Sequence, residues 1–248
     1  PLMLHPKPEE VAIIGLGSGV TLGASLTHPV SQVDTLEISP QVVEASAFFN
    51  SENHSALSDP RTNLIVGDGR SHLLLSSKRY DVIISEPSNP WMAGVATLFT
   101  REFFLAARER LNTGGILCQW AHTYDISDAD LRSIIATFLS VFSDGSVWLV
   151  GDGDVLLIGS ETPLDMLLTN IPKSWGKTAV TTDLREVNLR DPFSLLSLFV
   201  ARGTTIKQYV GDAQIQTDDK NSLEFSAPRG IYGKTEYTNA VTLRALRD

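Results

Sequence analysis

The chain has 248 residues, a formal net charge of −9 and a pI of about 5.0. This acidic balance argues against a surface for nucleic acid or anionic membranes, and a composition of 42% hydrophobic and 20% charged residues is typical of a globular protein with a large core. The single cysteine, Cys118, excludes an internal disulfide, and the five histidines show no paired ligand spacing, so no metal site is predicted.

The first apolar run, residues 11–14, is typical of a strand buried on both faces. Gly15, Gly17 and Gly19 follow directly, and residues 20–26 are compatible with a helix. Such a turn brings backbone N–H groups and the positive end of a helix close to a ligand. Val20 stands where the dinucleotide-binding pattern has a third glycine or alanine. The motif is therefore compatible with a purely structural turn. As a ligand site, it favours an adenosine-containing cofactor over a pyrophosphate.

Two acidic residues follow the next two predicted strands. Residues 33–36 lead into Glu37, which stands twenty residues after Gly17, the spacing at which an acid accepts hydrogen bonds from both ribose hydroxyls. Asp68, followed by Gly69, comes directly after the strand predicted at residues 63–66. Its position predicts either a ligand contact at the carboxyl edge of the sheet or an N-cap for a helix at residues 71–75.

A fourth apolar run, YDVIIS, leads into the sequence EPSNPW, which begins with Glu86. The two prolines exclude regular structure and stiffen the backbone. A rigid loop at the carboxyl end of a strand is a suitable mount for chemistry, so Glu86, Asn89 and Trp91 are candidate site residues. A structural turn with an exposed acid is the alternative.

The remaining pattern predicts an α/β fold, Rossmann-like, with a mostly parallel sheet that ends in an antiparallel hairpin. His122 is interpreted as a structural loop histidine and Cys118 as a buried strand residue. We expect residues 1–160 to form a cofactor-binding domain and residues 161–248 a C-terminal cap or edge elaboration. The expected elements are helices at 40–49, 100–111, 127–142, 163–168 and 192–201, strands at 80–85, 116–120, 146–150 and 155–160, and turns at 112–115 and 227–230.

Several stretches together resemble a known family. The chain resembles the class I S-adenosylmethionine-dependent transferase fold and, more narrowly, the spermidine/spermine synthase family, especially bacterial members whose synthase-like domain is fused to a membrane-spanning region. The stretches that carry the resemblance are IGLGSGVTLG, VDTLEISPQVVEA, DPRTNLIVGDGR, YDVIISEPSNPWMAGVATLFTREFF, LNTGGILCQWAH and TDDKNSLEFSAPR.

This resemblance implies roles for the candidate residues. The three glycines would line the amino-acid and ribose portion of the cofactor, Glu37 would hold the ribose hydroxyls, and Asp68 with Gly69 would contact the adenine. Family members carry Asp-Ser-Ser-Asp-Pro after the fourth strand, and their first Asp deprotonates the attacking amine. Here Glu86 keeps the acid, whereas Asn89 removes one negative charge that would help to hold a cationic amine.

The resemblance favours an aminopropyltransferase that uses decarboxylated S-adenosylmethionine and a polyamine acceptor, without a metal. The alternatives are an S-adenosylmethionine-dependent methyltransferase and a non-catalytic module that binds an adenosyl ligand. The expected partner is a small-molecule amine, with no nucleic acid and no membrane contact by this segment; a homodimer is left open. The expected location is the cytoplasm, including as the soluble domain of a membrane-anchored protein. Because the chain begins at Pro1, we expect either an excised segment of something longer or a processed form.

Overall fold

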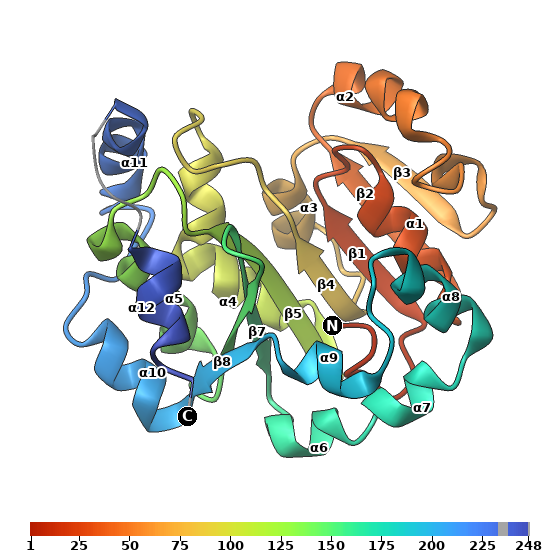
Figure 1. The fold of residues 1–248 in the computed structure, drawn as a ribbon. Helices are drawn as coiled ribbons and strands as arrows, with labels where there is room; N and C mark the ends of the chain where they lie inside the picture. Colours follow the sequence, from red (N-terminus) through yellow and green to blue (C-terminus); the bar gives the residue numbers. More distant parts are fainter. Residues whose placement is uncertain (233–237, 248) are drawn as a thin grey trace. The chain divides into compact units, whose positions relative to one another are not determined.

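The computed structural model describes residues 1–232 and 238–247 (Figure 1). Contacts between residues divide the chain into two compact units. The first unit comprises Pro1–Glu86, Arg110–Leu117 and Glu161–Ser197, and the second comprises Pro87–Glu109, Cys118–Ser160 and Leu198–Asp248. The residues expected to form one C-terminal addition after position 160 are thus shared between both units.

The eight strands follow the order β3-β2-β1-β4-β5-β7-β6-β8, with parallel pairs among β1 to β4 and antiparallel pairs among β6, β7 and β8. The predicted α/β fold with a mostly parallel sheet and a closing hairpin is therefore confirmed. The strands are β1 (Glu10–Ile14), β2 (Gln32–Glu37), β3 (Thr62–Val66), β4 (Tyr80–Ser85), β5 (Leu111–His122), β6 (Ser146–Val150), β7 (Asp154–Ser160) and β8 (Phe199–Arg202).

The core of the first unit forms because β1 is apolar on both faces. Its residues Val11 and Ile13 are fully or almost fully buried and cluster with Leu22 and Leu26 of helix α1 (Val20–Leu26). Burial of these side chains stabilises both β1 and α1, which are the strand and the helix that the sequence predicts here. The other helices of the unit are α2 (Pro40–Ala45), α3 (Gly69–Leu75), α6 (Leu164–Leu168), α7 (Ile171–Trp175), α8 (Thr178–Glu186) and α9 (Pro192–Leu196), with the 3₁₀ turns η1 (Ser46–Phe49) and η2 (Ala56–Ser58).

The second unit contains the predicted hairpin and a long amphipathic helix. Ser127 caps α5 (Asp128–Val141) by accepting a hydrogen bond from the Asp130 N–H at 3.1 Å. Cys118 is 2% exposed on β5, as expected for a buried strand residue. The remaining helices are α4 (Arg101–Glu109), α10 (Gly203–Val210), α11 (Leu223–Tyr232) and α12 (Asn239–Arg244), with the 3₁₀ turn η3 (Val95–Phe99).

Two predicted helix boundaries are wrong at their C-terminal ends. The helix expected at residues 40–49 is α2 followed by η1, so its last part is a 3₁₀ turn. The helix expected at residues 192–201 ends at Leu196, and β8 follows, antiparallel to β6. Pairing buries Val200 and Ala201, and Phe199 packs on Trp148 with ring centroids 5.4 Å apart. This long-range packing outweighs the local helical pattern.

Two predicted turns are also wrong. Residues 112–115 are already part of β5, because the Tyr80 N–H donates to the Arg110 carbonyl at 2.8 Å and starts the strand pairing directly after α4. Residues 227–230 lie inside α11, which accommodates Pro228. A Cβ on Gly230 would lie 2.3 Å from the Asp125 carbonyl oxygen, so close packing within the second unit holds this segment in its helix.

Candidate functional site

The carboxyl ends of β1 to β4 lie at one edge of the sheet and are joined by backbone hydrogen bonds within the first unit. The Gly15 N–H donates to the Leu36 carbonyl at 2.8 Å, and the Gly67 N–H donates to the Glu37 carbonyl at 2.9 Å. The Glu86 N–H donates to the Ile14 carbonyl at 2.8 Å. The segments that carry the predicted site residues of this unit therefore leave the sheet side by side.

The glycine turn after β1 depends on backbone conformations and approaches that side chains do not permit. Gly15, Gly17 and Gly19 all have positive φ, and Gly19 is the N-cap of α1. A Cβ on Gly15 would lie 2.3 Å from the Glu86 carbonyl oxygen. Gly15 thus allows the β1 turn to touch the start of the loop after β4, which brings the glycine turn close to the backbone of the candidate base.

Glu37 is a buried carboxylate fixed at the end of β2. Its side chain is 7% exposed, and its two oxygens accept hydrogen bonds from the Leu16 N–H at 3.0 Å and the Ser39 N–H at 2.9 Å. An ionised carboxylate has about four acceptor positions. The two hydrogen bonds therefore orient the Glu37 carboxylate, and its remaining acceptor positions suit a pair of hydroxyl donors.

Asp68 has the structural role that the sequence leaves open. It is the N-cap of α3 and accepts hydrogen bonds from the Arg70 N–H at 3.1 Å and the Ser71 N–H at 3.3 Å. A Cβ on Gly69 would lie 2.6 Å from a methyl carbon of Ile14, so Gly69 lets α3 begin close against β1. Their contact with adenine stays a prediction.

Asn53 is a positioning residue that the sequence analysis does not single out. It is 2% exposed, and its amide nitrogen donates to the Ser18 carbonyl at 2.8 Å and to the Ser46 carbonyl at 3.1 Å. It therefore ties the glycine turn to the segment after α2. An asparagine within the polar stretch 50–61 carries no local signal of this role, because its partners are distant in sequence.

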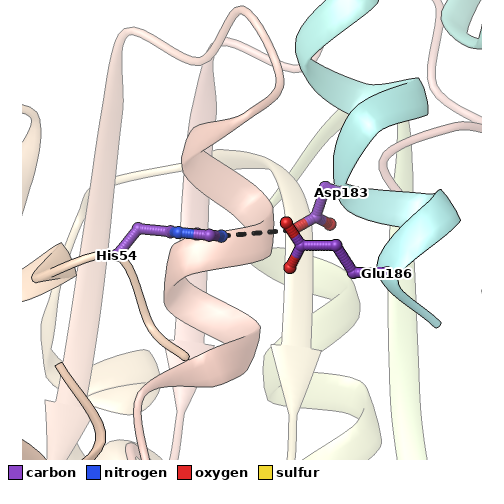
Figure 2. Close-up of side chains that lie close together, drawn as sticks. All are labelled: His54, Asp183 and Glu186. Carbon is purple, nitrogen blue, oxygen red and sulfur yellow. Dashed lines mark hydrogen bonds and ion pairs between the residues drawn. The ribbon is translucent and has the colours of Figure 1, made fainter. Parts of the chain in front are cut away.

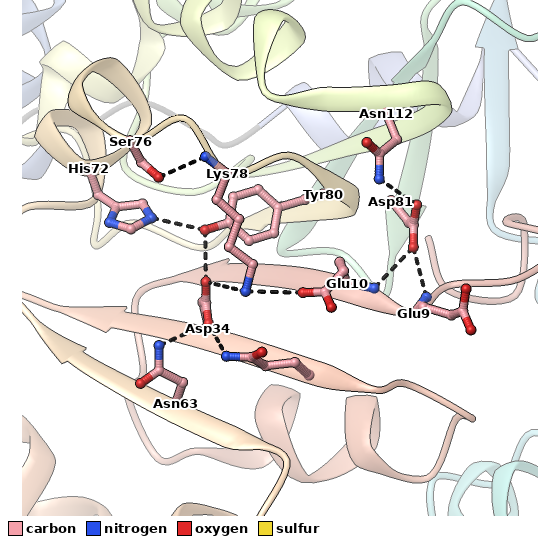
Figure 3. Close-up of polar contacts among 11 residues, drawn as sticks. Glu9, Glu10, Asp34, Asn63, His72, Ser76, Lys78, Tyr80, Asp81 and Asn112 are labelled. Carbon is pink, nitrogen blue, oxygen red and sulfur yellow. Dashed lines mark hydrogen bonds and ion pairs between the residues drawn. The ribbon is translucent and has the colours of Figure 1, made fainter.

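A polar cluster links side chains of β2, β3 and β4 to one another (Figure 3). Asp34 is 1% exposed and accepts hydrogen bonds from Tyr80 at 2.8 Å and Asn63 at 3.0 Å, and it pairs with Lys78 at 2.9 Å. Burial alone would raise the pKa of Asp34, but these three partners outweigh burial and lower the pKa. Because its partners compensate the buried charge, the cluster stabilises the pairing of these strands.

The predicted residues Asn89 and Trp91 belong to the second unit. There the Asn89 amide donates to the Tyr124 hydroxyl at 3.2 Å. Trp91 packs edge-on against His122 with ring centroids 4.8 Å apart, and against Tyr124 at 6.2 Å. We call Trp91, His122 and Tyr124 the aromatic cluster.

His122 is the last residue of β5 rather than a loop residue, and its side chain is completely buried. Its Nδ1 lies 2.5 Å from the Tyr124 carbonyl oxygen, which assigns the proton to Nδ1 and a lone pair to Nε2. Within the described residues, Nε2 has no hydrogen-bond partner. Burial lowers the pKa of His122 despite nearby Asp125 and Asp154, so the ring is neutral near pH 7.

The parallel strands, the glycine turn and the acid at the end of β2 define a class I methyltransferase-like α/β fold. The family model described as "Spermine/spermidine synthase domain" matches residues 1–150. The chain therefore belongs to the spermine/spermidine synthase domain family.

Individual relatives agree with this membership. Putrescine N-methyltransferase 2 of Nicotiana tabacum is 36% identical over 149 residues, which are 59% of this chain and 42% of the relative. The polyamine aminopropyltransferase of Thermococcus onnurineus is 39% identical over 118 residues, 47% of this chain and 42% of the relative. A crystal structure of spermidine synthase in complex with the transition-state analogue AdoDATO is 23% identical, with a TM-score of 0.65 over 85% of this chain and 71% of that one. The chain thus spans less than half the length of these two sequence relatives.

No helix within residues 1–232 and 238–247 combines the length and the apolar character that a bilayer crossing requires.

Proposed function

We propose that this domain is an aminopropyltransferase that uses decarboxylated S-adenosylmethionine and a polyamine acceptor. The observation that carries the proposal is the set of backbone hydrogen bonds that place the Gly15 turn, Glu37 and Glu86 at one edge of the sheet. The match to the spermine/spermidine synthase domain family and the aminopropyltransferases among its relatives support it.

The residues of the first unit suit an adenosyl ligand. Glu37 would accept hydrogen bonds from the two ribose hydroxyls, because its carboxylate is held in place and keeps free acceptor capacity. The left-handed turn of Gly15, Gly17 and Gly19 offers backbone next to the ligand without side-chain obstruction. Asp68 and Gly69, at the start of α3, are proposed to contact the adenine.

Glu86 is the proposed general base. A sulfonium makes the adjacent carbon electrophilic, so the protein has to align a neutral amine and accept its proton. The amine nitrogen forms a C–N bond to the aminopropyl carbon, the C–S bond breaks, and its electron pair stays on sulfur in the leaving 5′-methylthioadenosine. The proton leaves the amine nitrogen for the Glu86 carboxylate.

Asn89 and Trp91 are proposed to bind the acceptor amine. An indole face attracts an ammonium group, and this attraction contributes about 0.5–2 kcal/mol. Trp91 is held by His122 and Tyr124 in the aromatic cluster, and Asn89 is oriented by its hydrogen bond to Tyr124. An amide in place of the family's second acid selects less strongly for a doubly charged amine.

Methyl transfer to an amine is the second candidate, because putrescine N-methyltransferases are among the relatives, at 36% identity over 149 residues. Both reactions use an amine nucleophile and a sulfonium, and they differ in the group transferred. Turnover of putrescine with S-adenosylmethionine but not with the decarboxylated compound would favour the methyltransferase. Binding of either compound without turnover on any polyamine would favour the binding module.

The deciding experiment compares the domain and its Glu86→Gln variant with putrescine and decarboxylated S-adenosylmethionine. We expect turnover to fall by at least 100-fold, in the range of a lost general base, while calorimetry shows cofactor affinity within a few-fold of the parent. Glu44→Gln, at an exposed glutamate of α2, is the matched control and should keep full turnover. Unchanged turnover of Glu86→Gln would refute the assigned role.

The cytoplasmic location, the attachment to a membrane protein and a homodimer are further expectations. Fractionation of cells that express the full natural protein tests the first two, and light scattering of the purified domain tests the third.

A further inference from the structure

We propose that His54, Asp183 and Glu186 form a binding site for a divalent transition metal, for which Zn²⁺ is the best match. His54 lies in the segment between η1 and η2, and both acids lie on α8, so two segments of the first unit that are distant along the chain bring their side chains together (Figure 2). The spacing of histidines along the sequence could not reveal this group. The proposal does not depend on the transferase activity.

The distances suit zinc better than a direct contact between the side chains. His54 Nε2 and Asp183 Oδ1 are 3.5 Å apart, and ligand atoms of all three residues lie within 4.8 Å of one another. A 3.5 Å separation is at the outer limit of a hydrogen bond. With bonds of about 2.0–2.2 Å, two donors of a tetrahedral zinc site lie roughly 3.3–3.6 Å apart. A metal therefore fits between His54 and Asp183, and a small rotation brings in Glu186.

The charge of the group also calls for a cation. Asp183 and Glu186 are three positions apart on α8, so two like charges lie on one helix face, which weakens a helix by about 0.2–0.5 kcal/mol. In the described part of the chain, His54 is the ion-pair partner of Asp183, and Glu186 has no ion pair or hydrogen bond through its side chain. A divalent ion would compensate both carboxylates.

A separate observation is the cavity beside the group. The three residues line one side of a cavity of about 360 Å³, whose other walls come from α1 and from Asp59 and Arg61. Asp59 is engaged by Arg61 at 2.8 Å and is not needed as a ligand. Three protein ligands leave the fourth tetrahedral position open toward this cavity, where a water molecule or a small anion beside Arg61 would complete the coordination.

The donor set selects among metals. One imidazole and two carboxylates suit Zn²⁺ and Co²⁺, whereas Mg²⁺ prefers oxygen ligands alone and keeps several waters. His54 directly follows Asn53, whose side chain ties the glycine turn to the segment after α2. A metal at His54 would thus join this segment to α8 and stabilise the first unit.

The test titrates the domain, cleared of metal by a chelator that is then removed, with ZnCl₂ in a calorimeter and with CoCl₂ in a spectrophotometer. We expect one Zn²⁺ per chain, a visible Co²⁺ band typical of tetrahedral coordination, and a higher melting temperature with Zn²⁺. MgCl₂ should give no comparable heat.

Variants locate the site. His54→Ala, Asp183→Asn and Glu186→Gln should each weaken Zn²⁺ binding by at least tenfold, and Glu161→Gln, at another exposed glutamate, should leave it unchanged. All three ligand side chains are partly or fully solvent-accessible, so circular dichroism should show the parental fold. Absence of stoichiometric Zn²⁺ binding to the parent protein would overturn the proposal, as would undiminished binding by His54→Ala.

Discussion

The two units present their candidate residues in different ways. In the first unit, backbone hydrogen bonds between neighbouring strands fix the Gly15 turn, Glu37 and Glu86, and close approaches at glycine set the spacing. In the second unit, side chains hold Trp91 in place through ring contacts with His122 and Tyr124. We therefore expect cofactor binding to tolerate no added atom where one strand end touches the backbone of its neighbour, whereas acceptor binding should respond gradually to side-chain changes.

The strongest test of the backbone-defined site is Gly15→Ala. The added Cβ would lie 2.3 Å from the Glu86 carbonyl oxygen at a residue whose φ is +96°, so the strand ends have to move apart. We expect cofactor binding to weaken by more than 100-fold in calorimetry. Gly67→Ala is the matched control, because its Cβ meets nothing within 4 Å. Equal affinity in both variants would contradict a site defined by the backbone.

The next largest effect should come from Glu37→Ala. Loss of the carboxylate removes the proposed acceptor for two ribose hydroxyls and releases the Leu16 and Ser39 N–H groups. We expect cofactor binding to weaken by about 1.5–3 kcal/mol, or about 10- to 150-fold. Glu44→Ala serves as the control in the same titration. Full affinity of Glu37→Ala would place the ribose elsewhere.

A smaller effect is expected in the second unit from Trp91→Leu. Leucine fills part of the indole volume but offers no π face, so the KM for putrescine should rise by roughly 2- to 30-fold, the equivalent of about 0.5–2 kcal/mol. Cofactor affinity should stay within twofold. If the variant instead loses cofactor and keeps its amine KM, the assignment of Trp91 to the acceptor is wrong.

The smallest expected effect is the change in stability with pH that is due to His28. Burial and nearby positive charge lower the pKa of His28 to about 3 in the folded chain, against about 6.5 when unfolded. As the pH falls, the unfolded chain therefore binds a proton at His28 before the folded chain does. The contribution of neutral His28 to the free energy of unfolding is complete above pH 6.5 and is lost as the pH falls toward 3.

At pH 6 this loss amounts to roughly 0.8 kcal/mol. Urea unfolding of the parent and of His28→Gln at pH 7.5 and pH 6 should show a smaller pH dependence for the variant. An identical dependence in both proteins would mean that His28 is not held neutral.

Much of the first unit is predictable from local sequence. The apolar runs before Gly15, Glu37, Asp68 and Glu86 indicate parallel strands because each is short, apolar and bounded by turn residues. The order of such strands brings their carboxyl ends to one edge, which is why the sequence could group these four residues. Their individual roles toward a ligand stay predictions.

Other features depend on contacts that local pattern does not encode. The end of the helix predicted at residues 192–201 is instead the edge strand β8, because this segment pairs with β6. Helix α11 continues through Pro228 because Gly230 packs against the Asp125 carbonyl. Asn53 and the cluster of His54 with two acids of α8 likewise combine residues distant along the chain. A histidine such as His122 is indistinguishable from a surface loop residue until its burial is known.

The lone thiol of Cys118 offers a use that requires no engineering. Since it is 2% exposed on β5, a sulfhydryl reagent reaches it only when that strand opens. The rate of labelling at Cys118 therefore measures how often β5 opens in the native protein. A slower rate on addition of an adenosyl compound or Zn²⁺ would show how far each ligand suppresses this opening.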